Sequence, residues 1–281
     1  MEVKLMRQGD LHTHTTASDG TFSPSQNIQR AVEKGLKAIA ITDHDTINGV
    51  EAALEEASKH NDFECIPGIE ISTLYKGQDI HVLGYYIDYK DKNFLLTLEK
   101  LTSVRDQRNK MILQKLNELG IQIDESELEA KRCGEGNVGR GHIAEILMEK
   151  GIVNSLPEAF EKYLGKGKAA YAIPDRISPI EAVKIIQDAN GVPVLAHPGI
   201  YDADELIALL IENGLAGIEC CHPDHTIEQV HHYEKLAEKY SLIKTAGSDF
   251  HGFRNGEVFH GDIGSCTVPL STLRSLKNFC K

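Results

Sequence analysis

Histidine and carboxylate side chains recur in short clusters from one end of this 281-residue chain to the other. Nine of them have the types and the spacing of metal ligands. They are His12, His14, Asp19, His44, Glu70, His81, His197, Asp249 and His251. Imidazole and carboxylate groups together bind borderline or hard divalent cations, and sites that stay open to water are catalytic. The set therefore indicates several ions in one pocket and metal-assisted chemistry on a phosphate group.

Two of the clusters show ligands spaced two residues apart. His12 and His14 would alternate on a strand, so both side chains would point to one face and could hold one ion. Asp249 and His251 repeat the same spacing near the other end of the chain. Asp10 precedes the first pair, and we expect it to orient an imidazole without binding the metal itself.

Other candidate ligands stand at expected ends of strands. His44 lies where a strand would end and a helix begin, and its neighbours Asp43 and Asp45 are interpreted as turn and capping residues. Glu70 follows a Pro-Gly-Ile sequence, and its carboxylate could bridge two ions, which a neutral imidazole cannot do. His81 lies on an otherwise apolar strand, so its ligand role depends on the other clusters.

Short apolar segments alternate with amphipathic ones along most of the chain. Strands are expected at 37–42, 63–70, 80–87, 192–196, 216–220 and 242–245, and helices at 24–34, 46–60, 179–189, 204–213 and 227–240. This alternation predicts an α/β fold with parallel strands joined by crossover helices. Nearly every candidate ligand would then lie at the carboxyl end of a strand, where active sites form in α/β barrels.

The interval from 91 to 171 interrupts this alternation. Helical patterns are expected there at 93–119, 141–150 and 155–164. We interpret residues 91–171 as a helical insertion over the mouth of a barrel formed by residues 1–90 and 172–281.

Composition narrows the class of protein. The chain is 41% hydrophobic and 26% charged, as is ordinary for a globular enzyme, and its amino-terminal residues contain no apolar leader segment. Six cysteines without CxxC spacing indicate reduced thiols, so the cytoplasm is the expected location, with no membrane association. A net charge of −12 disfavours a long polyanion wrapped over the surface. It permits a small phosphate ligand, because bound cations would dominate the local field.

The clusters taken together resemble the polymerase and histidinol phosphatase (PHP) family of metal-dependent phosphoesterases. The matching segments are 10–14, 18–20, 41–45, 68–70, His81, 197–198 and 247–251. The resemblance implies a distorted seven-stranded (β/α)7 barrel with a site for three divalent ions. Mixed imidazole and carboxylate ligands suit Mn²⁺ first, with Fe²⁺ or Zn²⁺ as alternatives.

The resemblance also implies how the ligands divide among the ions. One ion would bind His12, His14 and Asp249, and it would share Glu70 with a second ion. The second ion would bind His81 and His197, and the third would bind Asp19, His44 and His251.

Two segments of the insertion, 137–144 and 159–168, resemble the subgroup that dephosphorylates nucleotides. That subgroup includes nucleoside 3′,5′-bisphosphate phosphatases and relatives that trim short oligonucleotides from the 5′ end. The chain has Gly141 and Ala169 where members often carry proline. The implied substrate is a nucleoside 3′,5′-bisphosphate, with 5′-to-3′ trimming of short RNA or DNA as the alternative and histidinol phosphate as a weaker one.

Several cationic residues could contact such a substrate. Arg140, Lys166 and Lys168 on the insertion suit a second phosphate held away from the metals, although each could also be a solvated surface cation. His142 could touch the ligand or simply pack, and His222 could contact phosphate or donate a proton to the leaving group. Arg140 and His222 are the candidate catalytic residues outside the metal ligands. The remaining histidines, His60, His225, His231, His232 and His260, are expected at the surface.

The expected reaction is hydrolysis of a nucleotide phosphate monoester by water activated among the ions. Two readings from other classes stay open at this point. An amidohydrolase also begins with a His-x-His strand, but it commonly bridges its metals with a carboxylated lysine, where this chain has Glu70. A non-catalytic scaffold of the same fold would be expected to lack some of the nine ligands. The sequence leaves the oligomeric state open.

Overall fold

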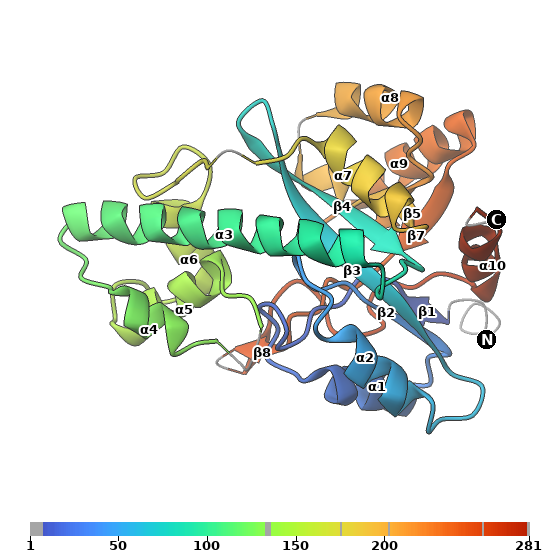
Figure 1. Cartoon of the computed structure of the whole chain (residues 1–281), viewed down its shortest axis with the longest axis horizontal. Helices are drawn as coiled ribbons and strands as arrows, with labels where there is room; N and C mark the ends of the chain where they lie inside the picture. Colours follow the sequence, from blue (N-terminus) through green and yellow to red (C-terminus); the bar gives the residue numbers. More distant parts are fainter. Residues whose placement is uncertain (1–7, 133–135, 175, 202, 255, 280–281) are drawn as a thin grey trace.

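Seven strands form one sheet in which each strand neighbours the next in chain order (Figure 1). The computed structural model describes residues 8–132, 136–174, 176–201, 203–254 and 256–279. The strands are β1 Gly9–Asp10, β2 Ala38–Ile41, β3 Glu64–Tyr75, β4 Gln78–Tyr85, β5 Val192–Leu195, β6 Gly217–Cys221 and β7 Ile243–Ala246. The amide of Leu11, just after β1, donates to the carbonyl of Ala246 at 3.1 Å. This bond links the first strand to the last, so the sheet is a nearly closed, distorted barrel, as expected.

Amphipathic helices pack against the outside of this sheet. They are α1 Pro24–Glu33, α2 Val50–Ala57, α7 Pro179–Asp188, α8 Asp204–Glu212, α9 Ile227–Tyr240 and α10 Leu270–Phe279. Local sequence fixes where they begin. Ser23 caps α1 and Ser178 caps α7, each in a reciprocal capping box with proline in the first turn. The five helices predicted for this part of the chain are present, whereas α10 was not predicted.

The expectation that all strands are parallel is wrong for β4. This strand runs antiparallel to both β3 and β5. Lys76 and Gly77 connect β3 to β4 in a tight turn with φ of +48° and +74°, so no crossover helix is needed. As a result β3 continues past Glu70, which pairs with Leu83 in the middle of the hairpin instead of ending a strand.

Except for α7, the helices between β4 and β5 extend to one side of the sheet (Figure 1). They are α3 Lys92–Glu118, α4 Glu125–Glu129, α5 Arg140–Glu149, α6 Leu156–Ala159 and the π-helical turn η2 Phe160–Leu164. They share an apolar core of their own, which includes Ile112, Leu116, Leu147 and Leu164. The long helix α3 is the element that connects this group to the strands (Figure 1).

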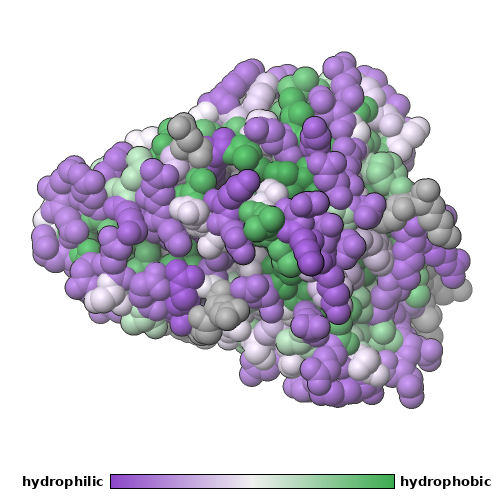
Figure 2. Space-filling view, viewed as in Figure 1, coloured by the Kyte–Doolittle hydropathy of each residue, from purple (hydrophilic) through white to green (hydrophobic). Residues whose placement is uncertain are grey.

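The face of the molecule seen in Figure 2 is predominantly hydrophilic, with apolar residues gathered in small groups. Among the described residues, no helix is both long enough and apolar enough to cross a membrane. Cys65, Cys220, Cys221 and Cys266 form no disulfide bond in the described part of the chain. Cys133 and Cys280 lie outside the described residues.

Candidate functional site

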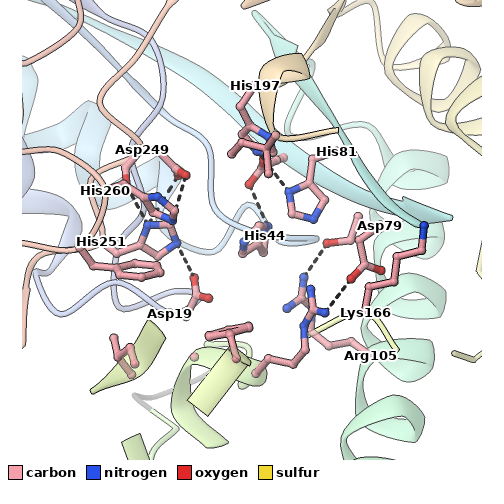
Figure 3. Close-up of a pocket in the computed structure, with 18 of the residues that line it drawn as sticks. Asp19, His44, Asp79, His81, Arg105, Lys166, His197, Asp249, His251 and His260 are labelled. Carbon is pink, nitrogen blue, oxygen red and sulfur yellow. Dashed lines mark hydrogen bonds and ion pairs between the residues drawn. The ribbon is translucent and has the colours of Figure 1, made fainter. Parts of the chain in front are cut away.

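All nine predicted metal-ligating side chains belong to overlapping groups whose ligand atoms lie close together. Figure 3 shows Asp19, His44, His81, His197, Asp249 and His251 around the cavity at this cluster. They arrive from different elements. His12 and His14 follow β1, His44 follows β2, His197 follows β5 and Asp249 follows β7. His12 and His14 were expected on a strand, but β1 ends at Asp10, and an isolated bridge from Thr13 to Phe250 holds the backbone between them. Glu70 and His81 come from the middle of the β3–β4 hairpin.

Glu70 occupies the centre of the cluster and is completely buried. Each carboxylate oxygen faces more than one imidazole. Oε1 lies 3.0 Å from His81 Nδ1, 3.1 Å from His197 Nε2 and 3.4 Å from His12 Nε2, and Oε2 lies 2.9 Å from His44 Nδ1 and 3.3 Å from His14 Nε2. A carboxylate that meets five imidazoles through two oxygens has the arrangement needed to bridge cations.

Two further carboxylates complete the cluster on the side of His14. Asp249 Oδ1 lies 3.3 Å from His12 Nε2 and 3.1 Å from His14 Nε2. Asp19 Oδ1 lies 3.3 Å from His251 Nε2. The imidazoles of His14 and His251 stack with their ring centroids 4.1 Å apart.

The atoms of this cluster fit divalent cations. Six buried side-chain atoms face one another at ion-pair distances but make no well-aligned hydrogen bond among the described residues. They are His12 Nε2, His14 Nε2, Asp19 Oδ1, His44 Nδ1, Glu70 Oε2 and Asp249 Oδ1. Buried polar atoms without partners are costly, so their convergence calls for a ligand that accepts lone pairs. Four overlapping groups have ligand atoms within 4.8 Å of one another: His14, Asp19, His44 and His251; His12, His14 and Asp249; His12, Glu70 and His197; and His44, Glu70 and His81.

Burial and charge act in opposite directions on the imidazoles. Burial lowers the pKa of His44 and of His197 to about 4. Burial also acts to lower the pKa of His14, but Asp249 and Glu70 outweigh it and raise that pKa to about 10. Burial acts to raise the pKa of Glu70 and of Asp249, but the neighbouring imidazoles outweigh it and hold both pKa values well below their usual range. The cluster therefore stabilises positive charge at its centre, which is what cations require.

A carboxylate that the sequence analysis missed orients two of the candidate ligands. Glu219 on β6 is fully buried, and its Oε1 lies 3.1 Å from His12 Nδ1. Its Oε2 accepts a hydrogen bond from the amide of His197 at 2.8 Å. Glu219 stands between Ile218 and Cys220 without a motif, and the only available signal was a charged residue within an apolar strand.

The role expected for Asp10 is wrong. Its carboxylate accepts hydrogen bonds from the amides of Ser248 at 2.9 Å, Gly264 at 2.8 Å and His12 at 3.3 Å, and among the described residues it makes no hydrogen bond or ion pair with an imidazole ring. Asp10 therefore ties β1 to the loop after β7, and Glu219 performs the orienting role. The backbones are so close here that a side chain on Gly247 would lie 2.2 Å from His12 Cβ.

A cavity of about 360 Å³ opens from the cluster towards α3, α5, α6 and η2. Asp19, His44, Glu70, His81, His197, Asp249 and His251 line one side of it. Arg140 and Lys166 line the other side, where Arg140 Nη1 contacts Asp79 Oδ2 at 2.7 Å. Lys168 is exposed, and His142 is buried and accepts a hydrogen bond from the Gly139 amide. Neither Lys168 nor His142 lines the cavity.

The structure places His222 behind Asp249 and not on the wall of this cavity. His222 is 2% exposed, its Nε2 lies 3.2 Å from Asp249 Oδ2, and its Nδ1 accepts a hydrogen bond from the Asp224 amide. His260 was expected at the surface, but it lines the cavity and its Nε2 lies 3.4 Å from Asp249 Oδ2. His260 belongs to no motif, and only the fold brings it here.

Arginines on α3 also line the cavity and were missed from the sequence. Arg105 and Arg108 are 6% and 3% exposed. They follow the same helical spacing as the buried residues Leu101 and Ile112. An arginine at a core-facing position of a helix was therefore the signal that could have identified them.

Comparison with known proteins agrees with this geometry. A family model described as PHP domain matches residues 10–173. The 5′-3′ exoribonuclease Rnm of Escherichia coli is 36% identical over 249 residues, which cover 86% of this chain and 84% of that protein. The 3′,5′-nucleoside bisphosphate phosphatase of Chromobacterium violaceum is 30% identical over 256 residues, 86% of each chain. A crystal structure assigned as a metal-dependent phosphoesterase from Bifidobacterium adolescentis superposes with a TM-score of 0.87 at 27% identity, over 97% of this chain and 96% of that one.

Proposed function

The chain belongs to the PHP family and is a metal-dependent phosphoesterase, and on that premise we propose that it removes the 3′-phosphate from a nucleoside 3′,5′-bisphosphate. One observation carries the choice of substrate. The cavity has the imidazole and carboxylate cluster on one side and cationic side chains on the other. A substrate with two phosphates would match both sides at once, with the scissile group at the cluster.

We propose that three divalent cations, Mn²⁺ first, are held by the nine clustered side chains. His12, His14 and Asp249 would hold one, Glu70, His81 and His197 a second, and Asp19, His44 and His251 a third. Such cations, when bound, neutralise the phosphoryl oxygens and lower the pKa of a water molecule towards neutrality. The unpartnered atoms of Glu70, His14 and Asp249 support this assignment.

The chain's own residues would orient the substrate. Arg140 would offer its guanidinium fork to a phosphate, and its contact with Asp79 would hold the fork in place. His222 would act through Asp249, which it contacts, and not through the substrate. Lys166 would add positive charge at the cavity wall. We also propose residues 1–90 and 172–281 as the barrel and residues 91–171 as an insertion that forms the far wall.

The second candidate function is 5′-to-3′ trimming of short oligonucleotides. The higher identity with the Escherichia coli exoribonuclease, 36% against 30% for the bisphosphate phosphatase, favours it. The two candidates differ in whether the attacked phosphoryl group is also esterified to a second nucleoside. The nucleotide on its other side is common to both substrates and would be bound in the same way. A small phosphorylated substrate is common to both.

A substrate panel tests the proposal. The purified chain would be assayed with Mn²⁺ on adenosine 3′,5′-bisphosphate, adenosine 3′-monophosphate, adenosine 5′-monophosphate, short 5′-phosphorylated RNA and histidinol phosphate. We expect the highest kcat/KM for the bisphosphate, with inorganic phosphate and adenosine 5′-monophosphate as products. A higher kcat/KM for RNA would establish the exonuclease instead, and a preference for histidinol phosphate would reject both.

A further inference from the structure

Two cysteine thiols face each other at the end of β6. Cys221 is the last residue of this strand, and Cys266 lies in the segment that follows β7 and precedes α10. The two residues are 45 positions apart in the sequence, yet Cys221 Sγ lies 3.1 Å from Cys266 Sγ. A disulfide has an S–S length of about 2.05 Å, so the two sulfur atoms need to approach by only about 1 Å to form one.

The two segments that carry these thiols are also held together by other contacts. In the turn after β6, Asp224 Oδ2 lies 2.5 Å from His260 Nδ1 of the segment after β7. Val268, two residues beyond Cys266, exchanges both backbone hydrogen bonds with Gly9 of β1, at 2.8 and 3.1 Å. Contacts on both sides of Cys266 therefore fix its backbone, and the fold itself keeps the two thiols close.

The strand presents its two neighbouring cysteines to different surroundings. Cys220 is 3% exposed and belongs to the same apolar cluster as Ile218 and Tyr233. Cys221 packs against the apolar cluster that contains Cys266. Successive side chains of a strand point to opposite faces, so the two thiols are directed apart. Cys221, and not Cys220, is therefore the partner that Cys266 can reach.

We propose that Cys221 and Cys266 are a site of reversible oxidation, and that their disulfide fixes the loop that carries Asp249 and His251 against β6. Both candidate ligands lie between the two cysteines in the sequence, so the bond would close a loop that contains them. The bond would form directly beside His222, whose Nε2 lies 3.2 Å from Asp249 Oδ2. This inference is independent of the substrate proposed above.

The oxidant would be a low-molecular-weight disulfide, such as glutathione disulfide. Cys221 is partly exposed and Cys266 is 7% exposed, so the oxidant meets Cys221 first. The Cys221 thiolate attacks one sulfur of the small disulfide and expels one thiolate, which leaves a mixed disulfide. Cys266 then loses its proton, attacks the Cys221 sulfur and expels the second thiolate. The protein gives up two protons and two electrons, and the small disulfide is reduced to two thiols.

The test oxidises the full-length chain with glutathione disulfide, blocks the remaining thiols and maps linked peptides by mass spectrometry. We expect a linkage between the peptides that contain Cys221 and Cys266, and excess reduced glutathione should remove it, as for the transient disulfides of reducing compartments. A cross-link restricts the unfolded chain, so the thermal unfolding midpoint of the oxidised protein should rise by roughly 5–10 °C. The midpoint should return to its original value after reduction.

Cys220→Ala is the matched control, because it removes the neighbouring thiol of the same strand. The linkage and the midpoint shift should persist in this variant, and both should disappear in Cys221→Ser and in Cys266→Ser. Circular dichroism and the unfolding midpoint of each reduced variant distinguish loss of the bond from loss of the fold. If Cys266→Ser does not fold, Cys221→Ser decides, because Cys221 is partly exposed.

Three results would overturn the proposal. The first is a wild-type chain in which Cys221 carries glutathione but forms no link to Cys266. The second is a link to Cys266 that persists in Cys221→Ser. The third is a linked wild-type chain whose unfolding midpoint does not rise, because the bond would then fix nothing that the fold does not already hold.

Discussion

Glu219 and His12 face each other inside the barrel, with Oε1 of the carboxylate 3.1 Å from Nδ1 of the imidazole. This contact turns the opposite nitrogen, Nε2, towards Glu70 and Asp249. Residues that orient a metal-binding histidine in this way control its basicity and its direction. Glu219 therefore prepares the site although it does not face the cavity.

Glu219→Gln should weaken metal binding while leaving the fold intact. Loss of such an orienting carboxylate typically costs about 10- to 100-fold in metal affinity or activity. Titration of the metal-free protein with Mn²⁺ would measure the shift, and excess Mn²⁺ should restore most of the activity. Glu238→Gln is the control, because Glu238 is an exposed carboxylate that pairs with Lys244. An unchanged Mn²⁺ affinity in Glu219→Gln would reject the orienting role.

Alanine at Asp19, His44 or His251 should abolish turnover without unfolding the protein. These three side chains share one of the candidate cation groups and line the cavity. Each substitution should lower kcat by more than about 1,000-fold, as when a member of a catalytic unit is removed. Activity assays, metal analysis and circular dichroism together provide the measurement. Full kcat in all three variants would refute the metal assignment.

The sequence was sufficient for those features that short segments determine. The candidate ligands could be selected because His12, His14, Asp249 and His251 differ from ordinary core residues by type and by spacing, and the structure brings them together. Helices α1 and α7 were located because capping is a local interaction, made by Ser23 and Ser178 with the first turn.

Features that depend on contacts distant in sequence were not predicted. The β3–β4 hairpin reversed an expected parallel strand, because apolar periodicity reports burial and not strand direction. Glu219 and His260 belong to no motif. Only the tertiary fold brings Glu219 to His12 and His260 to Asp249. Arg108 was not singled out from the sequence, because only the packing of α3 leaves it 3% exposed.

Asp45 and Arg105 form a buried ion pair in which each charge should depend on the other for its stability. Arg105→Met would leave Asp45 buried without its counter-ion, at a cost of about 3–5 kcal/mol. The double variant Asp45→Asn/Arg105→Met should lose less than the sum of the two single variants. Asparagine is chosen because residue 45 has φ of +55°, a region that asparagine tolerates.

Arg108→Met provides the contrast within the same helix. This guanidinium has no ion pair among the described residues, so its removal should leave the ligand-free protein as stable as the wild type or more stable. Urea unfolding of the metal-loaded protein measures all four variants. Equal losses in Arg105→Met and Arg108→Met would show that the two arginines are not distinguished by pairing.

The loop after β7 is anchored to α1 by Asp262, and this anchor should depend on pH. Arg30 donates to Asp262 Oδ1 at 2.8 Å and to Oδ2 at 2.6 Å, and Lys34 Nζ lies 2.6 Å from Oδ2. Partial burial opposes ionisation, but these cations outweigh it and hold the pKa of Asp262 below 3.8. A lowered folded-state pKa stabilises the protein above the unfolded pKa, and the contribution is lost as pH falls through the folded value. Because the pair is partly exposed, Asp262→Asn should cost only about 0.5–1 kcal/mol at pH 7. In urea unfolding the difference in stability between Asp262→Asn and the wild type should disappear as pH falls through the lowered folded-state pKa of Asp262. A difference that stays constant over the whole acid range would contradict the ionic origin of this anchor.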